Sequence, residues 1–320
     1  MTVSRDDVIF AYRLLLNRLP ESEAVISEHA RAEDLPALLA GFLRSREFLR
    51  KSPGPVGGRL PLDLPAQDID TDATDADTVR CLAEIRKIWT QLGINRPHFS
   101  VLTDRRFLPE NISGSLDHFW QTGQMEAARV VNAARRYGSG NPANHTCVEF
   151  GCGVGRVTID LARQYAVVHA YDISATHLAH ARRRAHDNGL TNIVFHHCGD
   201  DPLATLEPCD LYYSVIVFQH NPPVIISRLI RSALRTLKPS GVALFQVPTY
   251  ETGYHFRTSD WLAASHAPDM QMHCLPQLKI FEIITDENCS VLEVREDDWA
   301  GPDTQRLSNS FVVRKSDTPA

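Results

Sequence analysis

The chain has 320 residues, of which 43% are hydrophobic, and it carries a formal net charge of −6. This length suits one large core with a smaller unit beside it, and the negative charge argues against broad binding of nucleic-acid phosphates, which normally needs a basic face. Because the seven cysteines contain no C-x-x-C pair and no stretch is apolar enough to cross a bilayer, we expect a cytoplasmic protein without a membrane span.

The first 50 residues predict a small helical domain. Ser4 and Asp7 have the spacing of a capping box, and apolar residues follow at helical spacing as far as Leu19. A second helical run covers residues 35–43. We therefore expect an N-terminal helical domain over residues 1–50.

A polar segment of low complexity follows this domain. Residues 52–77 contain four prolines, three glycines and six aspartates, with few apolar side chains to bury. This composition is typical of a mobile linker. We therefore predict a linker over residues 51–77 and a second, larger domain over residues 78–320.

The larger domain contains a strand followed directly by a glycine-rich turn. Residues 146–156 have the sequence TCVEFGCGVGR, in which a short apolar strand precedes Gly151, Gly153 and Gly155, and helical spacing resumes after Arg156. A turn of this kind lets the backbone approach a ligand closely and directs free N–H groups toward it.

After the turn, strands and helices alternate along the chain. Strands are predicted at 167–171, 193–198, 211–218 and 242–247, and helices at 175–188 and 224–237. Alternation of this kind predicts an α/β fold, with a parallel sheet covered by helices on both faces.

The spacing of the glycines distinguishes between two classes of cofactor. A dinucleotide fingerprint is G-x-G-x-x-G, whereas this chain has G-x-G-x-G with Glu149 two residues before the first glycine. A carboxylate there would repel a pyrophosphate but would attract the ammonium group of a methionine moiety. We therefore predict that the turn binds S-adenosylmethionine.

Two further acids follow the next two strands. Asp172 ends the second strand, where a carboxylate can accept hydrogen bonds from both ribose hydroxyls. Asp200 and Asp201 follow the third strand, where a carboxylate can accept from the adenine amino group. An ordered series of acids at strand ends is more specific than the glycine turn alone.

Five segments resemble the motifs of the class I S-adenosylmethionine-dependent methyltransferases: VEFGCGVGR, VVHAYDIS, VFHHCGDD, DLYYSVIVFQH and LKPSGVALFQV. The resemblance implies an enzyme with a Rossmann-like, seven-stranded sheet, whose last strand, near residues 311–314, inserts antiparallel. The alternative is a nucleotide-binding Rossmann domain of another kind. The cofactor-binding residues that the resemblance implies are Glu149, Gly151, Cys152, Gly153, Gly155, Asp172, Ile173, Asp200, Asp201 and Gln219.

A hydroxyl acceptor needs a base, whereas an amine acceptor needs only to be neutral. His220 follows the fourth strand, where ligands of open α/β sheets bind, and we predict it to be that base. An equally weighted alternative is that His220 caps or buttresses the next helix. The Asp-Asn pair of the metal-dependent O-methyltransferases is missing after this strand, so we predict no catalytic metal. Further candidates to line the acceptor pocket are Tyr250, Tyr254, His255, Phe256 and His273.

The N-terminal domain carries a second resemblance. The segments YRLLLNRLPES and LRSREFL are similar to a short helical domain of unknown function that bacteria attach to enzymes acting on cell-surface glycans. The implied reaction is O-methylation of a sugar hydroxyl in a bacterial surface glycan or its precursor, within polysaccharide biosynthesis, with the N-terminal domain as a candidate site for a protein partner. The alternatives are an amine or protein acceptor and a catalytically silent scaffold. The sequence leaves the acceptor and the oligomeric state open.

Overall fold

The computed structural model describes residues 3–45, 47–48, 65–138, 140–198, 206–301 and 305–317. The chain divides into two compact units, Met1–Pro65 and Ala66–Ala320. In the described part of the chain, none of the helices has the length and apolar character needed to span a membrane.

The first unit contains three described helices, α1 (Arg5–Leu16), α2 (Glu23–His29) and α3 (Leu35–Leu43). The predicted capping box is confirmed, because the Asp7 N–H donates to the Ser4 hydroxyl while the Asp7 carboxylate accepts from the Ser4 N–H. The short helix α2 was not predicted. It begins after Ser22, whose hydroxyl accepts from the N–H of Val25.

Tyr12 lies at the centre of the core of this unit. Its ring packs edge-on against Phe42 with 4.8 Å between ring centroids, and its hydroxyl lies 3.2 Å from Nε2 of His29. The guanidinium of Arg18 lies 4.7 Å from the centroid of the Tyr12 ring and donates two hydrogen bonds of 2.7 Å to Glu47. The two segments that carry the second resemblance therefore meet in one small core.

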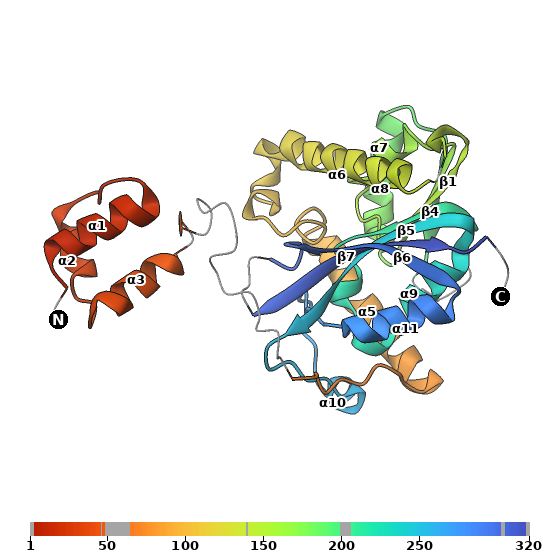
Figure 1. Ribbon diagram of the computed structural model, residues 1–320. Coiled ribbons are helices and arrows are strands. Elements are labelled where there is room, and N and C mark those ends of the chain that lie inside the picture. The colour runs from red at the N-terminus through yellow and green to blue at the C-terminus, as the bar shows by residue number, and fades with distance from the viewer. Residues whose placement is uncertain are drawn as a thin grey trace. The chain divides into compact units, whose positions relative to one another are not determined.

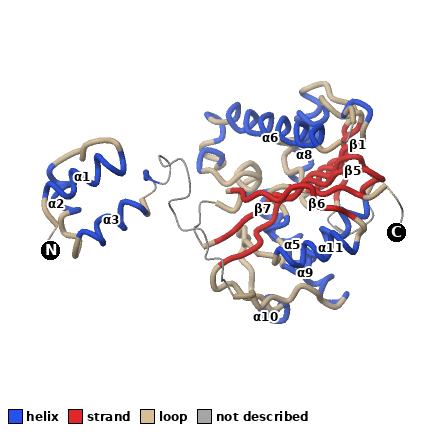
Figure 2. The backbone as a smooth tube through the Cα atoms, in the orientation of Figure 1, coloured by secondary structure: helices blue, strands red, loops and turns tan. Residues whose placement is uncertain are grey.

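The second unit is built around a seven-stranded sheet of order β3-β2-β1-β4-β5-β7-β6 (Figures 1 and 2). The first five strands in this order are parallel, and β7 pairs antiparallel with both β5 and β6. The predicted fold class is thus confirmed, including the antiparallel last strand. The strands are β1 (Thr146–Phe150), β2 (Val167–Asp172), β3 (Ile193–His197), β4 (Cys209–Ser214), β5 (Leu237–Glu251), β6 (Cys289–Asp297) and β7 (Arg306–Lys315).

Helices cover both faces of the sheet (Figure 1). One face carries α5 (Asp75–Asn95), α9 (Pro223–Thr236) and α11 (Gln277–Asp286), with α10 (Thr258–Ala263) beside α5. The other face carries α6 (Leu116–Arg136), α7 (Thr158–Ala162) and α8 (Ala175–Asp187). Strand β1 serves both faces by alternation, because Val148 and Phe150 join one hydrophobic core whereas Cys147 joins the other.

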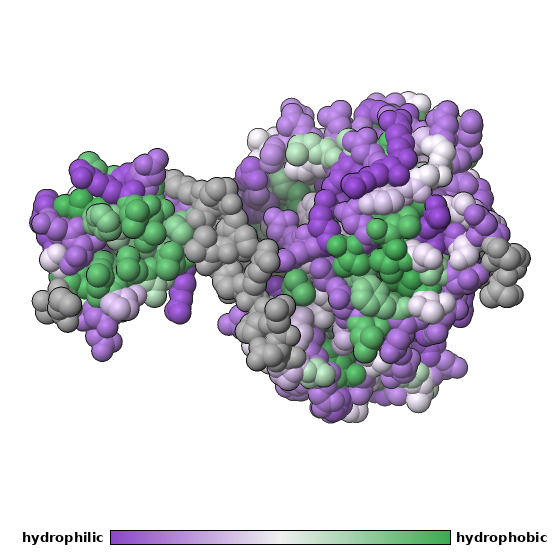
Figure 3. All heavy atoms as spheres, in the orientation of Figure 1, coloured by the Kyte–Doolittle hydropathy of each residue, from purple (hydrophilic) through white to green (hydrophobic). Residues whose placement is uncertain are grey.

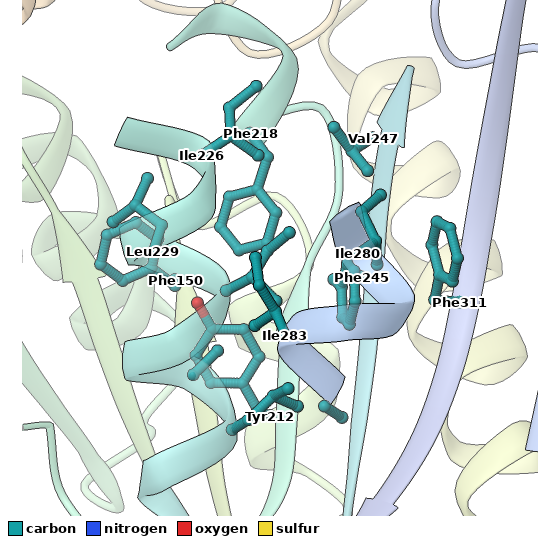
Figure 4. Packing of buried hydrophobic residues seen from close by; sticks show 14 of the residues in the cluster. Phe150, Tyr212, Phe218, Ile226, Leu229, Phe245, Val247, Ile280, Ile283 and Phe311 are labelled. Atoms are coloured by element: carbon teal, nitrogen blue, oxygen red, sulfur yellow. The ribbon is translucent and has the colours of Figure 1, made fainter. Parts of the chain in front are cut away.

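The larger of the two cores is rich in aromatic rings (Figure 4). Phe245 of β5 stacks on Phe311 of β7 with 5.2 Å between centroids, and Phe218 lies 5.8 Å from Phe245. Isoleucines of α9 and α11 close this layer from the helix side. The rings anchor the segment that follows β4, so this core positions one wall of the site described below.

The fourth strand is shorter than predicted. It ends at Ser214, whereas its continuous apolar sequence predicted a strand as far as residue 218. The reason is Ile216, whose φ of +60° is incompatible with an extended strand. A short 3-10 turn, η4 (Phe218–His220), follows.

The end of the predicted linker packs on the second unit. Ile69 forms a β-bridge with Phe256, and the carboxylate of Asp70 accepts from the N–H of Thr258 at 2.8 Å. Helix α5 already begins at Asp75. Aspartate-rich composition predicted a linker here, but the partners of these acids are remote in sequence, so composition alone did not show their contacts.

Candidate functional site

A pocket lies at the carboxyl ends of β1, β2 and β4. The helix α5 and the residues that follow it provide a further wall. Gly155 and Gln219 do not line the pocket, and Asp200 and Asp201 lie outside the described residues. Six predicted cofactor residues line it: Glu149, Gly151, Cys152, Gly153, Asp172 and Ile173.

The glycines allow the turn to pack closely against the rest of the chain. Gly151 and Gly153 have φ values of +78° and +56°. A Cβ atom on Gly151 would lie 2.3 Å from Cγ2 of Val217, and one on Gly153 would lie 2.4 Å from Cγ2 of Val101. Any side chain would therefore displace a wall of the pocket. Gly155 instead lets the turn pack against α8, because a Cβ atom there would lie 3.2 Å from the Cβ of Ala181.

The first three N–H groups of the turn are used within the protein, which corrects the expectation that they point freely at a ligand. Those of Gly151 and Cys152 donate to the carbonyl of Tyr171, at 2.8 and 2.9 Å. The N–H of Gly153 donates to Oδ2 of Asp172 at 2.8 Å. An anionic group of a ligand must therefore find hydrogen-bond donors other than these three.

Two buried ionisable groups in the pocket each have one polar atom without a partner among the described residues. Glu149 is 3% exposed and its Oε2 has no hydrogen-bond partner among the described residues; burial raises the pKa of its carboxyl to about 8. Arg156 is 5% exposed and its Nε likewise has no partner in the described structure. Another nitrogen of Arg156, Nη1, donates to the Thr122 hydroxyl at 3.3 Å, but each buried atom without a partner is costly. The pair fits a ligand that carries both an ammonium and a carboxylate, as the methionine moiety does.

Asp172 is held by the backbone of its own loop. Besides the bond from Gly153, its Oδ1 accepts from the N–H of Ser174 at 2.8 Å. Nδ1 of His177 lies 3.5 Å from Oδ1, and its Nε2 lies 3.0 Å from the hydroxyl oxygen of Ser100. A carboxylate has about four lone-pair sites, so Asp172 keeps capacity for ligand hydroxyls. Neither His177 nor Ser100 was predicted as a site residue, but both line the pocket.

His220 is buried and does not line the pocket. Its Nδ1 lies 2.9 Å from the carbonyl oxygen of Gln271 and its Nε2 lies 3.2 Å from Nε2 of Gln219. Burial lowers the pKa of the ring to about 4. Trp89, which does line the pocket, packs against the ring with 5.3 Å between centroids. These contacts favour the buttressing alternative, and the role of His220 as the base stays a prediction.

The aromatic segment after β5 does not line the pocket either. The Tyr254 hydroxyl lies 2.8 Å from Nδ1 of His273, and Phe256 is buried beside the same ring. In their place α5 supplies the apolar wall through Leu82, Ile85 and Trp89. Within the described ranges, no group of three or more His, Cys, Asp or Glu side chains is arranged to hold a metal ion.

Comparison with known proteins gives a family for the central part of the chain. Residues 147–241 match the methyltransferase domain family, and no curated protein sequence matches the chain. Magnesium protoporphyrin IX methyltransferase from Synechocystis with bound SAH is 19% identical over 73% of this chain and 99% of that chain, with a TM-score of 0.52. With bound SAM, the same protein gives 18% identity, 76% and 99% coverage and a TM-score of 0.50.

At such low identity these structures show the fold, which agrees with the sheet order described above. The family match begins within β1 and continues beyond α9, so it includes the glycine turn, Asp172 and the end of β4. Residues 147–241 thus match a methyltransferase domain, and they lie in a unit that has the fold of the class I methyltransferases.

Proposed function

We propose that this enzyme methylates a hydroxyl oxygen, namely that of a sugar in a bacterial surface glycan or in its small-molecule precursor. The observation that carries the cofactor part is that Oε2 of Glu149 and Nε of Arg156, two buried atoms of residues lining one pocket, have no hydrogen-bond partner among the described residues. The glycan part is supported by the N-terminal unit, whose Tyr12, Arg18 and Glu47 belong to the segments that resemble a domain attached to glycan-modifying enzymes.

Bound S-adenosylmethionine supplies an electrophilic methyl group. For the methionine moiety, Glu149 would accept hydrogen bonds from the ammonium and Arg156 would donate to the carboxylate. A nearby ammonium would also lower the raised pKa of Glu149, so that the carboxyl ionises when the cofactor binds. Asp172 would accept from the ribose hydroxyls through its remaining lone pairs. Together these groups would hold the cofactor at its amino-acid end and at its nucleoside end.

The remaining task of the protein is to align the acceptor and exclude water. Alignment of two reactants is worth up to about 7 to 11 kcal/mol in model reactions. The apolar side chains of α5 line the pocket and keep it dry, which strengthens the ionic contacts inside it.

An amine acceptor is the second candidate. A neutral amine needs no base, and both ring nitrogens of His220 already have partners within the protein. This observation favours N-methylation over O-methylation if no other group in the pocket removes a proton. A panel of acceptors decides between the two.

The first experiment is calorimetry with cofactors. We expect S-adenosylmethionine and S-adenosylhomocysteine to bind with micromolar dissociation constants, which correspond to a binding free energy of about −8 kcal/mol. We expect NAD not to bind. A matched variant, Arg156→Met, should weaken both ligands because it removes the donor for the carboxylate. Tighter binding of NAD would contradict the cofactor assignment.

The second experiment identifies the acceptor. Enzyme and methyl-labelled cofactor are incubated with nucleotide sugars, bacterial glycan fragments and a matched panel of amines, and mass spectrometry locates the label. Label on a sugar hydroxyl supports the proposal, and label on nitrogen supports the second candidate. A protein that binds the cofactor but labels no member of either panel or of a cell extract would be the silent scaffold.

The N-terminal unit is proposed as a docking element for this glycan machinery. Apolar residues gather on the face of the unit seen in Figure 3. Among the described residues of the unit, the exposed large apolar side chains are Phe10, Leu14, Leu19 and Leu35. Phe10→Ser with Leu14→Ser should leave cofactor affinity unchanged but reduce methylation of a polymeric acceptor; equal reduction with a small acceptor would contradict a docking role.

A further inference from the structure

Ile216 has the most unusual backbone conformation near the pocket. Its φ of +60° places it in the left-handed region, which is a clear outlier for a β-branched residue. Conformations of this kind cost about 1 to 3 kcal/mol and persist only where their surroundings enforce them. Ile216 itself lines the pocket.

This conformation shapes one wall of the pocket. In an extended strand, consecutive side chains point to opposite faces. Here three consecutive residues, Val215, Ile216 and Val217, all line the pocket, because the chain turns at Ile216. Val217 thereby reaches the glycine turn, where only the missing side chain of Gly151 leaves room for it.

A buried amide enforces the turn. The N–H of Ile216 donates to Oε1 of Gln246 at 3.0 Å. Nε2 of Gln246 donates in turn to Oε1 of Gln219 at 2.9 Å and to the hydroxyl of Ser308 at 2.8 Å. Gln246 is fully buried, and Gln219 and Ser308 are nearly so. Every polar atom of the Gln246 side chain therefore has a partner.

The chain of hydrogen bonds continues through His220, and its direction is fixed. The carbonyl of Gln271 can only accept, so Nδ1 of His220 must carry a proton. A neutral imidazole has one N–H, so Nε2 is left to accept from Nε2 of Gln219. The lowered pKa of His220 agrees with a neutral ring at pH 7. Each donor from Ile216 to His220 thus has an acceptor.

We propose that Gln246, Gln219 and His220 are positioning residues, whose one-way hydrogen-bond chain holds Ile216 in its left-handed conformation and so fixes residues 215–217 as a wall of the cofactor pocket. The inference rests on the cofactor pocket and is independent of the acceptor proposed above. Binding of S-adenosylhomocysteine therefore tests it whatever the acceptor is.

The first test removes the acceptor of the Ile216 N–H. Gln246→Met has a side chain of similar size but no amide, so Ile216 is released to a relaxed conformation. We expect the affinity for S-adenosylhomocysteine to fall roughly tenfold or more, which is the scale set by the strain that is relieved. Unchanged affinity in the folded variant would overturn the proposal.

A rescue experiment separates backbone conformation from general loss of packing. Glycine adopts positive φ freely whereas alanine does not, and neither retains the isoleucine side chain. In the Gln246→Met background, Ile216→Gly should therefore restore much of the affinity relative to Ile216→Ala. The same two substitutions in the wild-type background give the baseline for the lost side chain. Equal affinity of the two double variants, after this correction, would contradict a role through φ.

The second test is a measurement on the wild-type protein. Nitrogen NMR of histidine-labelled wild-type protein reports the tautomer of each ring, with His220→Asn assigning the signal. We expect His220 to be neutral at pH 7 with its proton on Nδ1. An imidazolium, or a proton on Nε2, would break the direction of the chain and would return His220 to consideration as a base.

Discussion

The glycine turn and the segment after β4 line the same pocket, but they are held in different ways. The turn is fixed by nearby groups, since Gly153 bonds to Asp172 across 19 residues of sequence. The segment after β4 is fixed from afar, because Ile216 depends on Gln246, 30 residues on, and Gln246 depends on Ser308, 62 residues further. Local constraints leave a motif in the sequence, whereas remote ones do not.

The largest effect is expected where the two regions touch. Gly151→Ala introduces a Cβ at 2.3 Å from Val217 in addition to the strain of positive φ. We expect the affinity for S-adenosylhomocysteine to fall about 100-fold or more, which corresponds to a loss of about 3 kcal/mol in binding free energy. Gly189→Ala is the matched control, because its φ is also positive but nothing lies within 4 Å of the added Cβ. Equal affinity of both variants for S-adenosylhomocysteine would show that the contact between the glycine turn and the segment after β4 does not matter for cofactor binding.

Acid pH should act on the segment after β4. Burial lowers the pKa of His220 to about 4 and that of His273 to about 3, from 6.5. Below pH 6.5 these two rings take up protons in the unfolded chain but stay neutral in the folded chain. The free energy of unfolding therefore falls as pH decreases from about 6.5 toward 4. The decrease is up to about 1.4 kcal/mol per pH unit for each ring.

Glu149 opposes this trend. Its raised pKa of about 8 makes the folded state the stronger proton binder between about 4.5 and 8, so it adds stability as pH falls through that range. The test therefore compares variants. His220→Asn keeps a donor for the Gln271 carbonyl and should flatten the urea-unfolding dependence on pH between 7 and 5. An unchanged slope would mean that His220 is not a buried neutral ring.

Asp172 tests the glycine-turn side. Asp172→Ala should weaken S-adenosylhomocysteine binding by about 1.5 to 3 kcal/mol, the range for charge-assisted hydrogen bonds. It should also lower the melting temperature, because the N–H groups of Gly153 and Ser174 lose their acceptors. Asp172→Asn retains one acceptor and should lie between Asp172→Ala and wild type in both measurements. Wild-type affinity in a folded Asp172→Ala variant would remove the ribose assignment.

The sheet and the cofactor turn were predictable because their determinants are short-range. The apolar strand at 146–150, the glycine spacing and the acids at strand ends all fall within single βα units. Their positions follow from the rule that parallel strands present their carboxyl ends at one edge. The antiparallel insertion of β7 came from family resemblance, since no local pattern specifies it.

Arg156 and His177 were missed as site residues for a different reason. Arg156 ends the glycine motif, but its burial depends on α6, where a Cβ on Gly123 would lie 1.8 Å from the Arg156 carbonyl oxygen. His177 faces the pocket because α5 packs close to the start of α8, where a Cβ on Gly93 would lie 2.3 Å from the Ser174 hydroxyl oxygen. Helix contacts of this kind are not visible in the spacing of one segment.

The apolar run after Ser214 shows the limit of periodicity. Continuous apolar residues predicted a strand to residue 218, but the chain turns at Ile216 because a glutamine on the neighbouring strand accepts its N–H. The preference of isoleucine for strands opposes this turn. A strained residue in a pocket is the kind of position where local sequence preference fails for functional reasons.

The smallest expected effect concerns Asn221, which lines the pocket and donates from Nδ2 to the carbonyl of Val217 at 2.8 Å. This bond ties the start of α9 to the wall that Ile216 shapes, but it joins two neutral groups, so Asn221→Ala should cost about 0.5 to 1.5 kcal/mol of stability. Cofactor affinity should fall by no more than a few-fold, because Gln246 still holds Ile216. Asn111→Ala is the control, since Asn111 makes a bond of the same length to the carbonyl of Arg105 on an exposed surface outside the pocket lining. Calorimetry and thermal melting of both variants should show similar small losses of stability but weaker binding only for Asn221→Ala. If Asn221→Ala abolished cofactor binding, the bond to Val217, and not the chain through Gln246, would be the main support of that wall.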